Sequence, residues 1–521
     1  MQHYDGGVKP RGLSIAAAAV AMTMLGATVA HATPPPAPWH LDRINQQSGP
    51  LDGDASLGPL TGAGVTIYVV DSGTRLSHEQ FGGRALAGAD PVTTSGQAPI
   101  EPRSSDCDGH GTHVAALAAG QTVGVAPGAT VVSVRVLDCE GQGTVENVVK
   151  GLQWIRSHHV SGRAAVVNLS LAVDRYDNGE EIDAQVKAMI AEGMVVTIAA
   201  GNGEKDIDGE NQPFDACLIS PGHVPSAITV AASTAADRPA SYSNFGPCVD
   251  LFAPGGNSAN PMVSAWFGND VNDGVDATRA AGNTSDDAWY MANQGTSMAS
   301  PLVAGYAALL AQQQPGLCGT QIHDAIVQRA TPNMLAGVDA TTANRLLYVD
   351  TTPIPASVPG RASSVITTVS NRSVVATWDP PCDGGSALTK TTVTLYEGSR
   401  VVQRKTVGPG TTAARFTGLK NGTRYRVRLQ HHNAVGDGAA TTRWRTVTVR
   451  QLRPGQTVAV SSIGAFGGDL TLRWKVASSS GSVCKLLTKP TRLRFTRRGT
   501  CRVELRTRAG GEPVFHNIRV G

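Results

Sequence analysis

Short apolar runs alternate with stretches of helical periodicity over the first two thirds of the chain. The apolar runs cover residues 65–70, 129–137, 164–171, 195–200 and 227–232. Between them, residues 145–156 and 182–192 show an amphipathic helical pattern. Fully apolar strands that alternate with helices are typical of a parallel sheet covered on both faces. We therefore expect an α/β fold here, a three-layer sandwich with a mostly parallel sheet.

The pattern changes after about residue 350. Three prolines lie between Thr351 and Pro359, and we interpret residues 351–355 as a linker. Beyond the linker, polar and apolar positions alternate as in half-buried strands, without any helical pattern. We expect an all-β sandwich at residues 356–450 and a small basic β domain at residues 451–521. Cys484 and Cys501 bracket the middle of the small domain, where one disulfide would help so small a core.

The N-terminus has the pattern of an export signal. Lys9 and Arg11 precede an apolar run at residues 13–29, and Ala30-His31-Ala32 fits a cleavage site. We expect a signal peptide at residues 1–32, with a permanent membrane anchor as the alternative, and a separate α/β domain at residues 33–350. No later segment is long and apolar enough to span a membrane. Export predicts a secreted, extracellular protein and makes the eight cysteines disulfide candidates.

The net charge of +3 conceals two parts of opposite sign. Residues 33–352 carry 15 Lys and Arg against 33 Asp and Glu, whereas residues 353–521 carry 27 against 7. The basic part is either a solvated surface or a surface that binds an anionic polymer such as cell wall. No basic run is dense enough to decide between these interpretations. We expect no nucleic-acid partner and a monomeric chain.

Three segments contain the residue types of nucleophilic catalysis. They are Val70-Asp71-Ser72-Gly73, Asp108-Gly109-His110-Gly111-Thr112-His113 and Gly295-Thr296-Ser297-Met298-Ala299-Ser300-Pro301. Peptide hydrolysis needs a nucleophile activated by a base, and a carboxylate that holds the base in one tautomer. We predict Ser297 as the nucleophile, His110 as the general base and then acid, and Asp71 as the orienting carboxylate.

The neighbourhood of Ser297 also predicts an oxyanion site. An apolar stretch of helical length follows at residues 298–312, and Pro301 is expected in its first turn. A helix N-terminus offers free backbone donors and a partial positive charge to a developing oxyanion. Asn202, in Ala199-Ala200-Gly201-Asn202, is the candidate for a second donor.

Each of these residues also has an alternative interpretation. Ser297 could cap a helix, and Asp71 could close a turn. His110 and His113 could belong to a metal site, although no third ligand lies at helical spacing. The joint pattern favours the triad, with His113 as a packed structural side chain.

The three segments resemble the signature motifs of the subtilase family, in its order Asp, His, Ser. The similarity covers residues 39–350 and is greatest to the proteinase K and aqualysin branch. The segment Pro38-Trp39-His40-Leu41-Asp42-Arg43-Ile44 resembles the start of the mature enzymes of that branch. It implies a subtilisin-like fold and a secreted serine endopeptidase that cuts proteins through an acyl-enzyme, without a catalytic cofactor. The alternative is a wall-binding or adhesion protein with an idle peptidase domain.

The resemblance also implies where the substrate binds. Two segments would pair with it as neighbouring strands: Gly141-Gln142-Gly143 on one side and Ser170-Leu171-Ala172 on the other. Relatives usually have glycine at the position of Ala172, and we predict no specificity from this methyl group.

The same resemblance implies disulfides and a structural calcium site. Cys107 would pair with Cys139 and Cys217 with Cys248, while Cys318 and Cys382 either pair or stay free. The carboxylate of Asp250 and the carbonyls of Pro225 and Ala227 would hold Ca²⁺, which prefers hard oxygen ligands. The sequence leaves the role of two further segments undecided. The acidic residues 204–210 could hold an ion or be solvated, and residues 267–293 could rim the cleft or form a surface loop.

Residues 356–450 resemble a fibronectin type III domain. The resemblance rests on Trp378-Asp379-Pro380-Pro381, on Gly418-Leu419 with Asn421-Gly422-Thr423 and Tyr425, and on Asn433-Ala434-Val435-Gly436. Such modules in bacterial enzymes resemble spacers or weak polymer binders, so no ligand is predicted.

Overall fold

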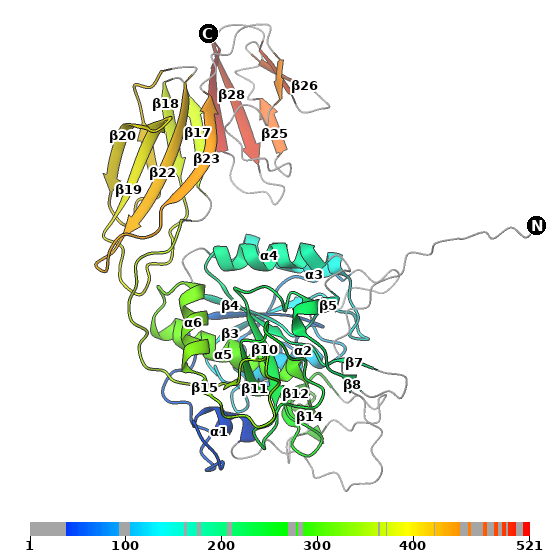
Figure 1. Cartoon of the computed structure of the whole chain (residues 1–521). Helices are drawn as coiled ribbons and strands as arrows, with labels where there is room; N and C mark the ends of the chain where they lie inside the picture. The colour runs from blue at the N-terminus through cyan, green and yellow to red at the C-terminus, as the bar shows by residue number, and fades with distance from the viewer. Residues whose placement is uncertain are drawn as a thin grey trace, which may run out of the picture. The chain divides into compact units, whose positions relative to one another are not determined.

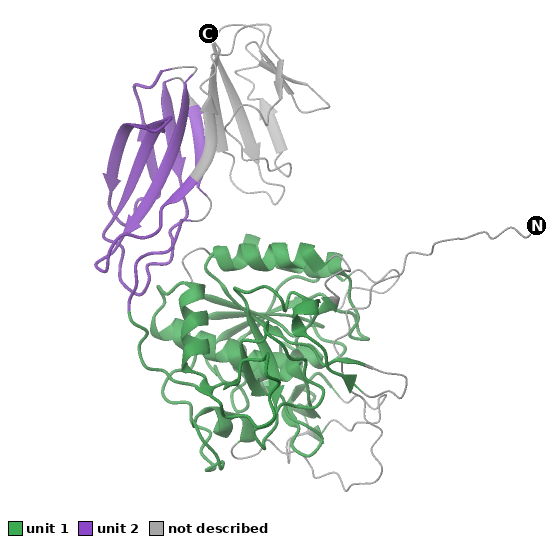
Figure 2. Cartoon of the chain, viewed as in Figure 1, with its two compact units in different colours: residues 1–355 green, residues 356–521 purple. Residues whose placement is uncertain are grey.

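The computed structural model describes most of the chain from residue 38 onward. The described residues are 38–92, 105–160, 164–174, 179–205, 211–268, 278–279, 285–362, 365–370, 372–420, 423–448, 457–459, 473–476, 484–487, 492–495, 499–506 and 514–520. The chain divides into two compact units, residues 1–355 and 356–521 (Figure 2). The expected signal peptide at residues 1–32 lies outside the described residues.

The first unit is built on a nine-stranded sheet (Figure 1). In spatial order its strands are β15 (Thr331–Pro332), β16 (Arg345–Leu346), β11 (Leu251–Pro254), β10 (Ile228–Ser233), β6 (Val195–Ala199), β4 (Ala165–Leu169), β1 (Thr66–Asp71), β3 (Thr130–Arg135) and β2 (Ala85–Ala87). All neighbours run parallel except β15 and β16. The predicted mostly parallel sheet is thus confirmed.

Helices cover both faces of this sheet. They are α1 (Trp39–Ile44), α2 (His110–Ala119), α3 (Val145–His158), α4 (Gly179–Ala191), α5 (Thr296–Gln313) and α6 (Gly319–Arg329), with short 3₁₀ turns η1 (Glu79–Phe81) and η2 (Ala216–Leu218). Along β1, Ile67 and Val69 join the core formed with α2 and α5, whereas Tyr68 and Val70 join the core formed with α3 and α4 (Figure 1). Burial of alternate residues on opposite faces explains why the strands are apolar throughout.

The parallel arrangement brings distant polar residues to one edge. Strands β1, β4 and β6 are neighbours, and their carboxyl ends are followed by Asp71 at the last strand position, by Ser170 and by Asn202. In parallel sheets this is the edge at which ligands bind. None of the described helices is long and apolar enough to cross a membrane.

Smaller ladders surround the main sheet. They are the antiparallel sheet of β12 (Met262–Trp266), β14 (Trp289–Asn293) and β13 (Thr278–Arg279), the pair β5 (Val173–Asp174) and β9 (Ile219–Ser220), and the pair β7 (Glu204–Lys205) and β8 (Asn211–Gln212). The described part of residues 267–293 is therefore strand in part. The residues of the expected acidic segment that are described belong to β7.

The second unit contains an antiparallel β-sandwich. One sheet has β17 (Ile366–Ser370), β18 (Ser373–Thr377) and β21 (Ala413–Phe416); the other has β20 (Arg400–Val407), β19 (Lys390–Glu397), β22 (Arg424–His432) and β23 (Thr441–Thr448). Trp378 and Phe416 are buried in its core with Tyr425 and Leu429. The alternation of buried and exposed residues along β22 is that of a sheet with one solvated face.

Six more strands lie among the described residues beyond β23. They form two three-stranded sheets. One has the order β24 (Thr457–Ala459), β27 (Arg492–Phe495), β26 (Cys484–Leu487); the other has the order β25 (Arg473–Val476), β28 (Gly499–Arg506), β29 (Val514–Val520). Cys484 and Cys501 lie on β26 and β28, and their expected pairing lies outside the described side chains.

Candidate active site

Asp71 and His110 form a buried pair at the carboxyl end of β1. His110 Nδ1 lies 2.7 Å from Asp71 Oδ1, and Oδ1 also accepts a hydrogen bond from the Ser72 amide at 2.8 Å. Burial alone would lower the pKa of His110, but attraction to Asp71 and the hydrogen bond to it raise that pKa to about 9. Because a carboxylate only accepts, Nδ1 carries a hydrogen, and Nε2 is left as the basic nitrogen.

One buried carboxylate organises the loop that leads into α2. Asp106 accepts hydrogen bonds from the Ser72 hydroxyl at 3.0 Å, the Gly109 amide at 2.9 Å, and the Thr112 amide and hydroxyl at 2.9 and 2.6 Å. Hydrogen bonds to an ionised acceptor are stronger than those between neutral groups. Asp106 therefore ties the loop after β1 to the first turn of α2, and so holds together the two segments that carry the buried pair.

Two glycines beside His110 permit close packing that a side chain would block. Gly109 has φ of 115°, and a Cβ built on it would lie 2.4 Å from the Trp266 ring. A Cβ on Gly111 would lie 2.0 Å from the carbonyl oxygen of Gly73. Only glycine fits at these two positions, which explains the Gly-His-Gly pattern in the sequence.

Ser297 lies in the first turn of α5, and this helix begins at Thr296 rather than at Met298. The earlier start has a tertiary cause. Asn202 Oδ1 accepts hydrogen bonds from the Thr296 amide at 2.9 Å and from its hydroxyl at 2.8 Å, so it caps the helix from another segment. The expectation that Pro301 falls in the first turn was therefore wrong, because Pro301 lies in the second turn.

Ser170 compensates for Pro301 in α5. Proline has no N–H, so the Ser297 carbonyl four residues earlier lacks its helical donor. The Ser170 hydroxyl donates to this carbonyl at 2.8 Å, and the Ser297 hydroxyl donates to the Ser170 carbonyl at 3.3 Å. Ser170 thus contacts both the backbone and the side chain of Ser297.

A buried polar network supports Ser170 from below. Asn168 Nδ2 donates to the Ser170 hydroxyl at 2.9 Å, and Asn168 Oδ1 accepts from Ser300 at 2.8 Å and Thr197 at 3.0 Å. All four side chains are buried. Our sequence reasoning missed Asn168, although a polar residue inside the apolar run 164–171 is a signal that could have found it.

Asn202 and Ser297 face the same cavity of about 630 Å³. This cavity brings the expected substrate-binding residues Ser170, Leu171 and Ala172 together with both. Its remaining described lining consists of Val173, Ala199, Gly201, Gly203, Glu204, Gln212, Pro213, Phe214, Leu218, Ile219, Asn244 and Thr296. Since the Asn202 carbonyl oxygen is bound to Thr296, its amide nitrogen is the group left to donate beside Ser297.

The expected segment Gly141–Gly143 is not among the residues that line this cavity. It lies in a tight turn after β3, where the Asp138 amide donates to the Gln142 carbonyl at 2.7 Å and Gly143 bridges to Leu137. The turn leaves Gly141 with φ of 67°, a conformation that favours glycine.

Asp108 lies between this turn and His110. A Cβ built on Gly141 would be 3.2 Å from Asp108 Oδ2, and Asp108 Oδ1 accepts from the His110 amide at 3.0 Å. Burial, reinforced by the negative charge of Asp106, raises the pKa of Asp108 to about 6 even though His110 opposes this. The site therefore contains, besides Asp71 and Asp106, a third carboxylate near His110 that sequence reasoning did not single out.

His113 has a structural environment. Its Nε2 lies 3.1 Å from the carbonyl oxygens of both Met262 and Met291, so the ring joins α2 to β12 and β14. Burial lowers the pKa of His113 to about 3, which keeps the ring neutral. These contacts fit a packed side chain and not a metal ligand.

The structure contains disulfides between Cys107 and Cys139 and between Cys217 and Cys248. The first lies in the loop that precedes His110, and Arg135 Nη2 is 3.4 Å from Cys107 Sγ. Cys318 and Cys382 are also disulfide-bonded.

Asp250, the carboxylate expected to bind Ca²⁺, is partly buried. Its Oδ2 accepts from the Thr229 amide at 2.8 Å, and burial raises its pKa to about 6, although that hydrogen bond and His323 act in the opposite direction. A cation would offset this burial of negative charge, and the carbonyls of Pro225 and Ala227 are hard donors that suit Ca²⁺. Among the described residues there is no group of three or more His, Cys, Asp or Glu that could hold a metal.

A parallel α/β sheet with a buried Asp–His pair and a serine at a helix N-terminus defines the class of serine hydrolases. A model of the subtilase family matches residues 62–347, and a fibronectin type III model matches residues 359–448. The chain therefore belongs to the subtilase family of serine peptidases, and its second unit contains a fibronectin type III domain.

Individual relatives agree with this assignment. The extracellular serine proteinase of Thermus sp. (strain Rt41A) is 42% identical over 319 residues, 61% of this chain and 68% of that protein. Alkaline serine exoprotease A of Vibrio alginolyticus is 36% identical over 312 residues, 60% of this chain and 50% of that protein. A crystal structure of a cold adapted subtilisin-like serine proteinase matches with a TM-score of 0.51 and 38% identity, over 60% of this chain and 99% of that one.

Proposed function

We propose that this chain is a secreted serine endopeptidase that cuts proteins through an acyl-enzyme on Ser297. The observation that carries the proposal is the buried His110–Asp71 pair, at 2.7 Å. Helix α2, which begins at His110, packs against α5, and Ser297 lies in the first turn of α5. Ser297 would attack the scissile carbonyl while His110 Nε2 takes its proton and later returns it to the leaving amine. Asp71 would hold the imidazole in one tautomer and stabilise the imidazolium that forms.

Asn202 and the Ser297 amide are the proposed oxyanion donors. The Asn202 carbonyl oxygen is held by two hydrogen bonds to Thr296, which fixes the direction of its amide group. The helix N-terminus adds a partial positive charge at the point where negative charge develops. Donors that are fixed before the reaction need no reorganisation when the tetrahedral intermediate forms.

The substrate would bind as an extended strand between two segments of the enzyme. Ser170–Ala172 is the proposed partner on the side of the cavity, and Gly141–Gly143 is the proposed partner on the other side. The cavity beside Ser297 would then take the side chain of the residue whose carbonyl is attacked.

Labelling with a fluorophosphonate probe tests this function. The secreted full chain should be labelled and should hydrolyse casein, whereas Ser297→Ala should do neither. Labelling that persists in Ser297→Ala would assign the nucleophile elsewhere. A folded chain that is neither labelled nor active would favour the wall-binding or adhesion alternative.

Secretion and calcium binding are further parts of the proposal. The disulfides support secretion, because such bonds persist in oxidising compartments. N-terminal sequencing of the protein from the medium should begin at or after Thr33. A structural Ca²⁺ would be held by Asp250, Pro225 and Ala227, where it would offset the partly buried negative charge of Asp250, and it would take no part in catalysis.

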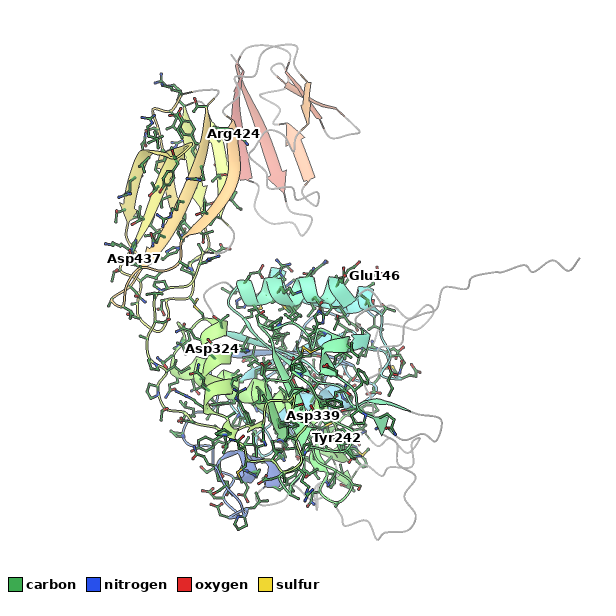
Figure 3. The ribbon with its side chains drawn as sticks, viewed as in Figure 1. Glu146, Tyr242, Asp324, Asp339, Arg424 and Asp437 are labelled. Atoms are coloured by element: carbon green, nitrogen blue, oxygen red, sulfur yellow. A yellow bond between two sulfur atoms is a disulfide. The ribbon has the colours of Figure 1, made fainter. Side chains whose placement is uncertain are left out.

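One surface of the second unit supports the proposal that this unit binds an anionic polymer. Arg424, Arg426 and Arg428 alternate with buried Tyr425 and Val427 along β22, so their side chains share the outer face of the sheet (Figure 3 labels Arg424).

The basic face extends across three strands of that sheet. Arg428 and Arg404 lie opposite the same residue, Thr394 of β19, and Arg426 lies over the Tyr396 ring at 4.8 Å. Such a face suits an anionic wall polymer. Ser297→Ala protein should bind poly(glycerol phosphate) at low salt, and replacing Arg404, Arg426 and Arg428 by Glu should abolish this binding; unchanged binding would contradict the assignment.

A further inference from the structure

Glu204 is the one ionisable residue among those described in the lining of the cavity beside Ser297. Its side chain is exposed. The cavity walls also include the apolar side chains of Leu171, Phe214 and Ile219. Apolar wall residues together with a single accessible carboxylate match a side chain that has a hydrocarbon stem and a cationic head, because such a side chain buries its stem and keeps its charge near water.

The backbone holds Glu204 at this cavity. Glu204 opens β7 and pairs with Gln212 of β8, and Asn244 fixes the base of this hairpin. Asn244 Oδ1 accepts from the Gly203 amide at 3.1 Å and from the Phe214 amide at 3.0 Å, one on each side of the hairpin.

Asn244 also joins the hairpin base to the strand that leads to Asn202. Its Nδ2 donates to the Ala200 carbonyl at 2.9 Å, and its side chain is buried. The carboxylate is therefore carried by a segment anchored to the proposed oxyanion site.

We propose that Glu204 makes this peptidase prefer Lys or Arg as the residue whose carbonyl Ser297 attacks. The inference rests on the proposed function, since it requires that the cavity receives this residue of the substrate. The charge of the surrounding domain acts in the same direction: residues 33–352 carry 15 Lys and Arg against 33 Asp and Glu, which attracts cationic substrates.

A matched pair of substrates isolates the effect of the positive charge at the attacked residue on kcat/KM. Peptide amides that differ only in arginine or its neutral isostere citrulline at the attacked residue are compared by kcat/KM with the full chain, Glu204→Gln and Glu146→Gln. Glu146 is the control, because it forms a surface ion pair with Lys150 on α3 and loses the same charge (Figure 3). Active sites are first counted by fluorophosphonate labelling.

We expect the arginine-to-citrulline ratio to exceed one in the full chain and in Glu146→Gln, and to fall about two- to fivefold in Glu204→Gln, the size of an exposed ion pair. The ratio should also fall as salt is added. Equal ratios in the two variants, with normal labelling, would overturn the preference and leave the proposed function standing. Absence of labelling in the unaltered chain would instead overturn the proposed function, and this inference with it.

Discussion

His110 Nδ1 lies 2.7 Å from Asp71 Oδ1 in a buried pair, and this contact makes the imidazole a stronger base than an ordinary histidine. A general base works only when it is neutral, so activity should grow as pH rises through its pKa. With that pKa raised to about 9, we expect kcat/KM to increase from neutral pH and to level off only above about pH 9. Initial rates on a peptide anilide across this range provide the measurement, and a plateau already reached at neutral pH would contradict the assignment.

Asp71→Asn should remove both the charge that attracts protonated His110 and the acceptor that keeps the hydrogen of neutral His110 on Nδ1. We expect kcat/KM at neutral pH to fall about 10⁴-fold, while the protein stays folded. The remaining activity should depend on pH at lower values than in the unaltered chain, because burial then lowers the pKa of His110 against only the weaker effects of Asp108 and Asp106. A circular dichroism spectrum checks the fold, and a loss below tenfold would argue against the proposed role of Asp71.

Asp108→Asn should move the same pH profile to lower pH. The negative charge of Asp108 helps to raise the pKa of His110, less strongly than Asp71 does. Removing it should therefore shift the rise in kcat/KM by a smaller amount than Asp71→Asn, with maximal activity largely kept. Glu146→Gln removes a charge at the surface and should leave the profile unchanged; a profile of Asp108→Asn that coincides with it would show that Asp108 does not act on His110.

The Asp71–His110 pair and the place of Ser297 near a helix start could be predicted because their signals are local. Each of Asp71, His110 and Ser297 is embedded in a short motif with its own glycines, and the close approach at Gly109 and Gly111 explains why those glycines are needed. The mostly parallel sheet could be predicted equally well, because strands buried on both faces appear in the sequence as unbroken apolar runs.

The features that sequence reasoning missed depend on contacts between distant segments. The start of α5 is set by Asn202, 94 residues before Thr296, and no local rule of helix capping includes such a residue. The strand β14 was not predicted either, since residues 267–293 are rich in turn formers. Glu204 lies on β7, and Asn244, which is distant in the sequence, holds both ends of the β7–β8 pair through hydrogen bonds to the Gly203 and Phe214 amides.

Ser170→Ala should test the compensation for Pro301. The Ser297 carbonyl would lose its donor, and a buried acceptor without a partner costs about 1–3 kcal/mol of the free energy of unfolding. We also expect kcat to fall by about 10- to 100-fold, because Ser297 would no longer be held in one position. Urea unfolding and initial rates measure the two effects.

Pro301→Ala in the Ser170→Ala background provides the matched rescue. Alanine restores the N–H that donates to the Ser297 carbonyl, so the double variant should regain stability relative to Ser170→Ala. If the double variant is no more stable than Ser170→Ala, the hydroxyl acts by some route other than replacing the missing helical donor.

Asn202→Ala should separate the chemical step from substrate binding. We expect kcat to fall about 10²- to 10³-fold with KM little changed, the size of loss caused by removing one such donor in subtilisin, a member of the same family. Because Asn202 also caps α5, Asn202→Asp is the comparison: it keeps the oxygen that accepts from Thr296 but loses the donor. Equal activity of Asn202→Asp and the unaltered chain would remove Asn202 from the oxyanion site.

Calcium should stabilise the first unit through Asp250, and the effect should depend on pH. Burial raises the pKa of this carboxyl to about 6, so in the absence of a cation its ionised form is destabilised in the folded state. The folded protein binds a proton here that the unfolded chain releases, which makes stability fall as pH rises between about 4 and 6. Ca²⁺ would reverse this at neutral pH, where the carboxylate is ionised and free to bind.

We therefore expect added Ca²⁺ to raise Tm at pH 7.5 and to have a much smaller effect at pH 5, where protons compete for Asp250. Asp250→Asn should abolish the increase at both pH values, whereas Asp324→Asn on the surface of α6 should retain it. Differential scanning fluorimetry measures Tm in EGTA and in millimolar Ca²⁺ for the unaltered chain and the two variants, each at both pH values. An increase in Tm that survives in Asp250→Asn would assign the ion to another site, because no other carboxylate takes part in the proposed one.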